Sequence, residues 1–222
     1  MFKESLYKEA LRKFAGEHVL RFVEKHGKNA LRLGGEKKYL TMYFQDVSGF
    51  ASLAEGLTPE ALVGVLNEYL ETMSKVILRH DGAIDKYIGS SIVAFWGIEG
   101  HKTHPSDACK CALDCLDRLA DINNRFAKDK KSLKLQIGIN TGWVMLGNFG
   151  SPSRLSYAVI GDTVNLASKL EIANKNYGTQ ILLSEFTRKE LDQSFSVKEI
   201  DAVRVKGKED PVTIFTLESM GS

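Results

Sequence analysis

The stretch YLTMYFQDVSGF, residues 39–50, decides how this chain of 222 residues is interpreted. Strand-forming residues lead into a single carboxylate, Asp46, and the strand pattern breaks at Gly49. A carboxylate at the end of a strand can hold a cation, while backbone N–H groups of the small residues that follow face an anion. The same pattern also makes an ordinary turn, so the rest of the chain must distinguish a site from a turn.

The composition is that of a soluble globular protein. The net charge is only +2 and the basic residues form no long block, so the charge pattern does not indicate nucleic acid. No apolar run approaches the roughly 20 residues that span a bilayer, and no signal peptide opens the chain, which predicts a cytoplasmic protein. Cys109, Cys111 and Cys115 cannot all pair and lack a second zinc-ligand cluster. We therefore expect buried thiols in a reduced protein.

Residues 1–36 differ from the rest of the chain. Their apolar residues recur at helical spacing among many charges and end at Gly34-Gly35. This pattern predicts a helical lead-in that cannot form a core alone and that packs on a partner or connects to an upstream sensor or regulator. We assign residues 37–222 to one domain.

The elements of that domain alternate in a recognisable order. After the first strand, Thr58-Pro59 predicts the start of a long amphipathic helix, followed by a hairpin of strands 83–88 and 92–96. A second helix over 106–127 precedes a strand over 133–140, which we expect to turn at Thr141-Gly142 into residues 143–147. The order predicts an α+β fold with a ferredoxin-like βαββαβ core, an antiparallel sheet with helices on one face. The other face of the sheet must be covered or used.

A C-terminal α/β subdomain extends this core. Residues 148–159 form an extended arm, residues 161–174 a helix and residues 180–183 a strand. A short helix to residue 191 and two or three closing strands to residue 217 complete the prediction.

Three further groups of residues are candidates for chemistry. Strand alternation places Lys86 on the apolar face with Ile84, where it needs a counter-charge, a partner or a ligand unless it reaches water. Asn165 and Lys169 share one face of the predicted helix, which is either a solvated stripe or a binding face. Lys206 lies in the turn VKGK, residues 205–208, which is either a plain surface turn or a turn that binds an anion.

Five motifs, in order, resemble the catalytic domain of class III adenylyl and guanylyl cyclases. They are FQDVSGF (44–50), DKYIG (85–89), IGINTG (137–142), VIGDTVNLAS (159–168) and VKGK (205–208). The resemblance covers about residues 37–218. It implies that two such domains pair head to tail and form the active site across their interface, as a homodimer or with a related cyclase domain.

The resemblance also implies roles for single residues. Asp46 and the carbonyl of Val47 would hold Mg²⁺ or Mn²⁺, and the backbone amides of Ser48, Gly49 and Phe50 would bind the triphosphate. The partner chain would supply Lys86 to the adenine ring, Asn165 to the ribose, Lys169 to the transition state and Lys206 to the terminal phosphates. The reaction would convert ATP to 3′,5′-cyclic AMP and pyrophosphate.

Three positions depart from the family pattern. The second metal-binding Asp is Ser90, and no nearby carboxylate is evident, because Asp85 is expected on the opposite strand face from Lys86. The transition-state Arg is Lys169, which keeps the charge but loses the planar fork. The second base-reading position is Ala158, which cannot hydrogen-bond to a base.

Two functional classes follow from these departures. One is an adenylyl cyclase whose activity is weak or depends on a partner, and Lys86 favours ATP over GTP. The alternative is a catalytically inactive pseudocyclase that acts as a nucleotide-binding or regulatory dimerisation module. An RNA-binding ferredoxin-like sheet would need an aromatic signature that this chain lacks, and a diguanylate cyclase would need a Gly-Gly-Asp/Glu-Glu-Phe hairpin, which is also missing.

Overall fold

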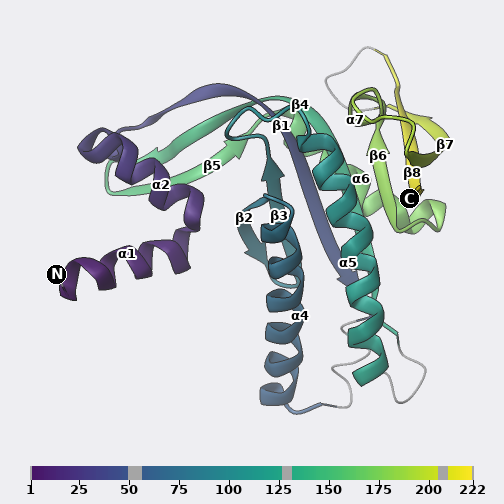
Figure 1. The fold of residues 1–222 in the computed structure, drawn as a ribbon, viewed down its shortest axis with the longest axis horizontal. Coiled ribbons are helices and arrows are strands. Elements are labelled where there is room, and N and C mark those ends of the chain that lie inside the picture. Colours follow the sequence, from purple (N-terminus) through teal and green to yellow (C-terminus); the bar gives the residue numbers. More distant parts are fainter. Residues whose placement is uncertain (1, 50–56, 127–131, 205–209, 222) are drawn as a thin grey trace.

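A computed structural model describes residues 2–49, 57–126, 132–204 and 210–221. The lead-in consists of two helices and a 3-10 turn: α1 (Phe2–Ala15), α2 (Glu17–His26) and η1 (Gly27–Leu31). In Figure 1 these purple elements lie at one end of the molecule, beside the far ends of the longest strands.

The predicted βαββαβ core is confirmed. It consists of β1 (Gly34–Ser48), α4 (Pro59–Arg79), β2 (Ala83–Ile88), β3 (Ser91–Trp96), α5 (His104–Phe126) and β4 (Lys134–Ser151). Thr58 begins α4 as expected, since its side chain accepts a hydrogen bond from the backbone N–H of Ala61 at 3.3 Å.

The C-terminal part adds β5 (Arg154–Ile160), α6 (Asp162–Tyr177), β6 (Ile181–Ser184), α7 (Glu185–Arg188), β7 (Phe195–Val203) and β8 (Val212–Met220). The sheet runs β2-β3-β1-β4-β6-β8-β7, and β5 pairs with β4 outside this path. Among the described strands, β4 and β6 pair in parallel and the other pairings are antiparallel. The predicted fold class, α+β with a mostly antiparallel sheet, is therefore confirmed.

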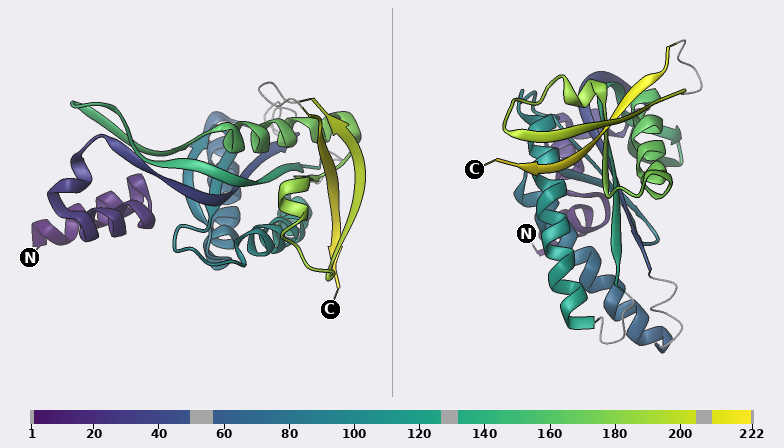
Figure 2. Two further views of the ribbon diagram at one scale, coloured as in Figure 1. Left: turned by 90° about the horizontal axis from the view of Figure 1, so that it is seen from above. Right: turned by 90° about the vertical axis from the view of Figure 1, so that its right-hand side faces the viewer.

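The helices form layers on both sides of this sheet. Helices α4 and α5 lie side by side on one face and enclose the main apolar core, which includes Tyr43, Trp96 and the three cysteines. All three thiols are buried and free, as the sequence predicts. Helix α6 lies on the opposite face, over β4 and β1 (Figure 2, left). The face that the core alone would leave open is thus partly covered by the C-terminal subdomain.

The predicted turn at Thr141-Gly142 is wrong. Strand β4 runs without interruption from Lys134 to Ser151 and pairs with the whole of β1. Gly142 is instead required by close packing, because a Cβ atom there would lie 2.8 Å from the hydroxyl of Thr163 at the start of α6. Gly142 lies where α6 packs closely on the strand, and a glycine in the sequence does not by itself distinguish such close packing from a turn.

The lead-in packs on the sheet through α2. Leu20 and Ala30 are buried, and the ring of His18 meets Phe95 of β3 edge-on at 5.4 Å. The side-chain amide of Asn148 donates hydrogen bonds to the carbonyls of Ala30, at 2.6 Å, and Arg32, at 3.0 Å. Helix α1 packs against α2. Among the described residues, no helix combines the length and the apolar character that a bilayer crossing needs.

Candidate functional site

Asp46 lies at the end of the central strand β1 and is contacted from the neighbouring hairpin. The hydroxyl groups of Ser90 and Ser91 both donate to its Oδ1 atom, at 3.0 and 2.9 Å. The tight turn at Gly89, with a φ of 61°, brings these two serines to the carboxylate. Position 90 therefore faces Asp46 directly and presents a neutral hydroxyl group to it.

The residues after Asp46 form the start of the predicted phosphate loop. The side chain of Val47 is buried in the main core, which fixes the backbone whose carbonyl is the predicted metal ligand. Ser48 Oγ donates to the carbonyl of Lys134 at 3.3 Å. Gly49 has a φ of 93°, a conformation that favours glycine over residues with a side chain. Phe50 and Lys206, both predicted site residues, lie outside the described residues.

Helix α6 carries the predicted polar stripe. Asn165 and Lys169 are exposed, while Leu166 and Leu170 on the opposite side of the helix are buried, so the predicted facing of this helix is confirmed. Glu171 on the same helix is half-buried. Burial raises the pKa of its carboxyl to about 7, and the nearby negative charge of Asp46 adds to this increase. A second carboxylate therefore lies close to Asp46, which the sequence analysis missed.

The structure corrects the predicted position of Lys86. The pairing of β2 with β3 shifts between Ile84 and Lys86, so Asp85 forms a β-bulge. Ile84 lies opposite Ala94, on the helix-covered face, whereas Lys86 lies opposite Val93, on the other face. Strand alternation put Lys86 with Ile84 because it assumed a regular strand.

Asp85 is also not separated from Lys86 as predicted. Its side chain is only 4% exposed and pairs with the Lys86 ammonium at 3.1 Å. Burial raises the pKa of the Asp85 carboxyl, and the pairing with Lys86 opposes this increase. The lysine side chain stays 47% exposed and is held at the sheet surface by its neighbour.

The other predicted residues face outward or lie apart from Asp46. Within the described parts of the chain, no hydrogen bond or ion pair joins Asp46 to Lys86, Asn165 or Lys169. Ala158 is buried in β5, opposite Gly147 of β4.

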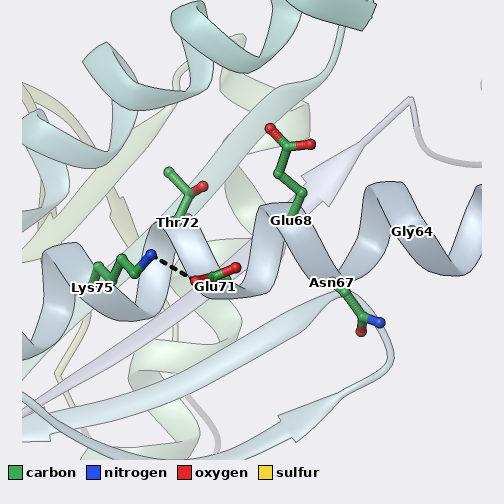
Figure 3. Close-up of a pocket in the computed structure, with 6 residues that line it drawn as sticks. All are labelled: Gly64, Asn67, Glu68, Glu71, Thr72 and Lys75. Atoms are coloured by element: carbon green, nitrogen blue, oxygen red, sulfur yellow. Dashed lines mark hydrogen bonds and ion pairs between the residues drawn. The ribbon is translucent and has the colours of Figure 1, made fainter.

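One surface hollow of the molecule lies along α4 (Figure 3). It is lined by Gly64, Asn67, Glu68, Glu71, Thr72 and Lys75. Lys75 and Glu71 form an ion pair of 2.6 Å within this hollow. None of the predicted site residues lines it.

Comparison with known proteins identifies the family. A profile for the adenylate and guanylate cyclase catalytic domain matches residues 35–219. The chain belongs to this family. It is 34% identical to adenylate cyclase 1 of Rhizobium meliloti over 181 residues. The aligned region covers 81% of this chain and 27% of that protein. The chain therefore spans about a quarter of the length of this relative.

Two solved cyclase structures resemble the cyclase domain equally well. The adenylyl cyclase CyaB from P. aeruginosa is 34% identical, with a TM-score of 0.75, and the match covers 84% of this chain and 97% of that one. The guanylyl cyclase Cya2 is also 34% identical with a TM-score of 0.75, and covers 85% of this chain and 96% of that one. Overall similarity thus does not distinguish adenine from guanine specificity.

The donor atoms around Asp46 fit a hard divalent cation. Within the residues that the structure describes, no group of three or more His, Cys, Asp or Glu side chains could bind a metal by itself. Asp46 nevertheless has a second carboxylate, Glu171, nearby, and the buried amide oxygen of Gln136 opposite it has no hydrogen-bond partner among the described residues. Oxygen donors of this kind suit Mg²⁺ or Mn²⁺, which also retain water and phosphate ligands.

Proposed function

We propose that this cyclase domain converts ATP to 3′,5′-cyclic AMP and pyrophosphate at a dimer interface, with activity that is weak or depends on a partner. The observation that carries the proposal is the contact of Ser90 with Asp46. It supports the assignment of position 90 as the second metal position, because its side chain lies at hydrogen-bonding distance from the first metal carboxylate. A full negative charge is missing there.

Each side chain has a defined task in this proposal. The Asp46 carboxylate and the Val47 carbonyl hold the cation, and the backbone N–H groups of Ser48 and Gly49 bind phosphate oxygens. When bound, the divalent cation neutralises charge on the triphosphate and on the attacking 3′-oxygen. The ribose 3′-oxygen attacks the α-phosphorus and pyrophosphate leaves, so positioning and charge stabilisation are the main contributions of the protein.

The exposed residues act across the interface. Lys86 contacts the adenine ring of the partner's substrate, Asn165 orients the ribose, and Lys169 supplies positive charge at the transferred phosphorus. Their exposure in a single chain supports a role toward a second domain. The same face and the β4–β5 arm would form a two-fold homodimer or a heterodimer with a related cyclase domain, with two equivalent sites in the symmetric case.

The preference for ATP depends on Lys86, since guanine-selective relatives place an acidic residue at this position. Ala158 has no hydrogen-bonding group, so it does not reinforce the preference. The lead-in helices are the proposed input from an upstream sensor or regulator.

Restoring the missing groups tests the proposal. We expect the wild-type chain to bind ATP with Mg²⁺ or Mn²⁺ and to turn it over slowly, whereas Ser90→Asp combined with Lys169→Arg raises turnover. One oriented electrostatic group is worth roughly 10²–10³ in rate, and the gain should appear first with Mn²⁺. Asp46→Asn in the double variant is the matched control and should abolish the gain. Sedimentation at high micromolar concentration should show a dimer.

The results also separate the two functional classes. Family-like turnover by the wild type would show that another group replaces the Asp at position 90. A double variant that binds ATP and dimerises but stays inactive would favour the pseudocyclase. The observation that favours this second candidate is that two hydroxyl groups already donate hydrogen bonds to Asp46 Oδ1, the carboxylate that would hold the metal.

A further inference from the structure

The side-chain amide oxygen of Gln136 is buried on the strand next to Asp46. Gln136 on β4 lies directly opposite Asp46 in the antiparallel pairing with β1, so both side chains share one face of the sheet. Gln136 is only 7% exposed, and its Oε1 atom has no hydrogen-bond partner within the described chain. A buried amide oxygen normally has a hydrogen-bond partner, because an acceptor that is removed from water and left unpaired is unfavourable.

The orientation of this amide follows from its other contact. Gln136 Nε2 donates to Ser48 Oγ at 3.0 Å, and the Ser48 hydroxyl donates onward to the Lys134 carbonyl. Since the Ser48 oxygen must accept from Gln136, the amide nitrogen has to face it. The amide oxygen is then the atom left free on the Asp46 side of the sheet.

Helix α6 brings the second oxygen donor to the same place. Gly138 lies two residues after Gln136 on the same face of β4, and α6 crosses directly above it. A Cβ atom at Gly138 would lie 2.1 Å from the Ala167 carbonyl and 2.3 Å from the backbone nitrogen of Glu171. The glycine therefore lets the backbone of Glu171 pack directly on β4, two residues along the strand from Gln136.

Helix α6 thus brings a second carboxylate, Glu171, to the face of the sheet that carries Asp46. The two serine hydroxyl groups at Asp46 are neutral. Two carboxylates and an unpaired amide oxygen on one half-buried face form the kind of ligand set that a hard divalent cation needs.

We propose that Glu171 and Gln136 supply oxygen ligands to the divalent cation at Asp46 and so replace the carboxylate that is missing at Ser90. This inference rests on the proposed function, which gives the cation its role in the cyclase reaction. It concerns cation binding itself, however, which can be measured without turnover. Water and the nucleotide phosphates would complete the coordination.

Mn²⁺ binding to the full-length chain tests the inference. Free Mn²⁺ is followed by electron paramagnetic resonance, with and without a non-hydrolysable ATP analogue. Glu171→Gln and Gln136→Met keep the size of each side chain but remove the ligand charge or the ligand oxygen, and each should weaken Mn²⁺ binding about 10-fold or more. Asp162→Asn removes the same charge from the exposed start of α6 and should leave binding unchanged.

A compensating variant provides the second measurement. Ser90→Asp in the Glu171→Gln background should restore the lost affinity, because it adds a carboxylate at a position that contacts Asp46. Thermal melting in the presence of a chelator should show that Glu171→Gln is folded and not less stable than wild type, because the substitution removes a repulsion.

The outcomes separate this inference from the proposed function. If Asp46→Asn abolishes Mn²⁺ binding while Glu171→Gln and Gln136→Met bind like wild type, the inference is overturned and the cyclase proposal stands. If both variants weaken binding but no variant turns over ATP, the ligand assignment stands and the proposed activity fails. If wild type binds no Mn²⁺ with or without nucleotide, both are overturned.

Discussion

A single methyl group at Gly138 should displace α6 and lower both stability and activity. In Gly138→Ala the new Cβ atom would lie 2.1 Å from the carbonyl oxygen of Ala167 and 2.3 Å from the backbone nitrogen of Glu171. Both atoms belong to helix backbone, so no side-chain rotation relieves the clash. The helix as a whole must move away from β4.

The size of the effect follows from these distances. A carbon atom needs about 3.3 Å from a carbonyl oxygen, so α6 must move by roughly 1 Å. Overpacking of this kind costs about 1–3 kcal/mol, which corresponds to roughly 2–12 °C in Tm for a chain of this size. The shift also moves Glu171 and Asn165, and a 1 Å misplacement at an active site can cost about 10²-fold in rate.

The assay compares thermal melting, Mn²⁺ binding and ATP turnover with those of a matched substitution. Gly64→Ala makes the same chemical change in α4, where nothing lies within 4 Å of the new atom. It should stabilise the protein by about 0.5–1 kcal/mol, because alanine is the better helix former. A Gly138→Ala variant that melts at or above the wild-type temperature would show that α6 does not rest on β4 at this position.

Two further predictions concern the lead-in. Burial lowers the pKa of His18 to about 4, so the unfolded chain takes up a proton near pH 6.5 and the folded chain does not. The free energy of unfolding should therefore fall by up to about 3 kcal/mol as the pH drops from 6.5 to 4. His18→Phe should flatten this pH dependence in denaturant melts. An unchanged slope in the variant would show that the ring is not buried in solution. Removing residues 1–15 should change Tm little, whereas removing residues 1–33 should leave a folded domain at least about 4 °C less stable, because the Asn148 amide loses both acceptors. Equal Tm values for the two truncations would contradict the packing of α2.

Most of the core could be predicted because its signals are local. The alternation that leads to Asp46, the Thr58-Pro59 helix start and the spacing of apolar residues in α4 and α5 each identify an element without knowledge of its neighbours. Position 90 is assigned to the metal site through the family resemblance, and the structure shows its side chain in contact with Asp46. The ordered motifs then identified the family.

The errors share one physical cause, which is contact between elements distant in sequence. The bulge at Asp85 reverses the face of Lys86, and no local signal marks a buried aspartate as a bulge. Gly142 and Gly138 make room for α6, and the sequence gives the same residue for a turn and for a close approach. Glu171 is 125 residues from Asp46 along the chain, so only the crossing of α6 over the sheet reveals it as a neighbour.

Under the proposed function, the departures at Ser90 and Lys169 would be compensated in different ways. Ser90 contacts Asp46 inside one chain, so an oxygen donor that the same chain brings to that face would replace its lost charge, and we propose Gln136 and Glu171 for this task. Lys169 is exposed on the outer side of α6, and in the proposed mechanism it acts on the substrate of the partner domain. In this proposal, the charge lost at Ser90 is replaced by ligands of the same subunit, whereas the change at Lys169 is compensated by the position of the partner domain. This distinction explains why a domain could retain cation and nucleotide binding while its turnover depends on which cyclase domain it pairs with.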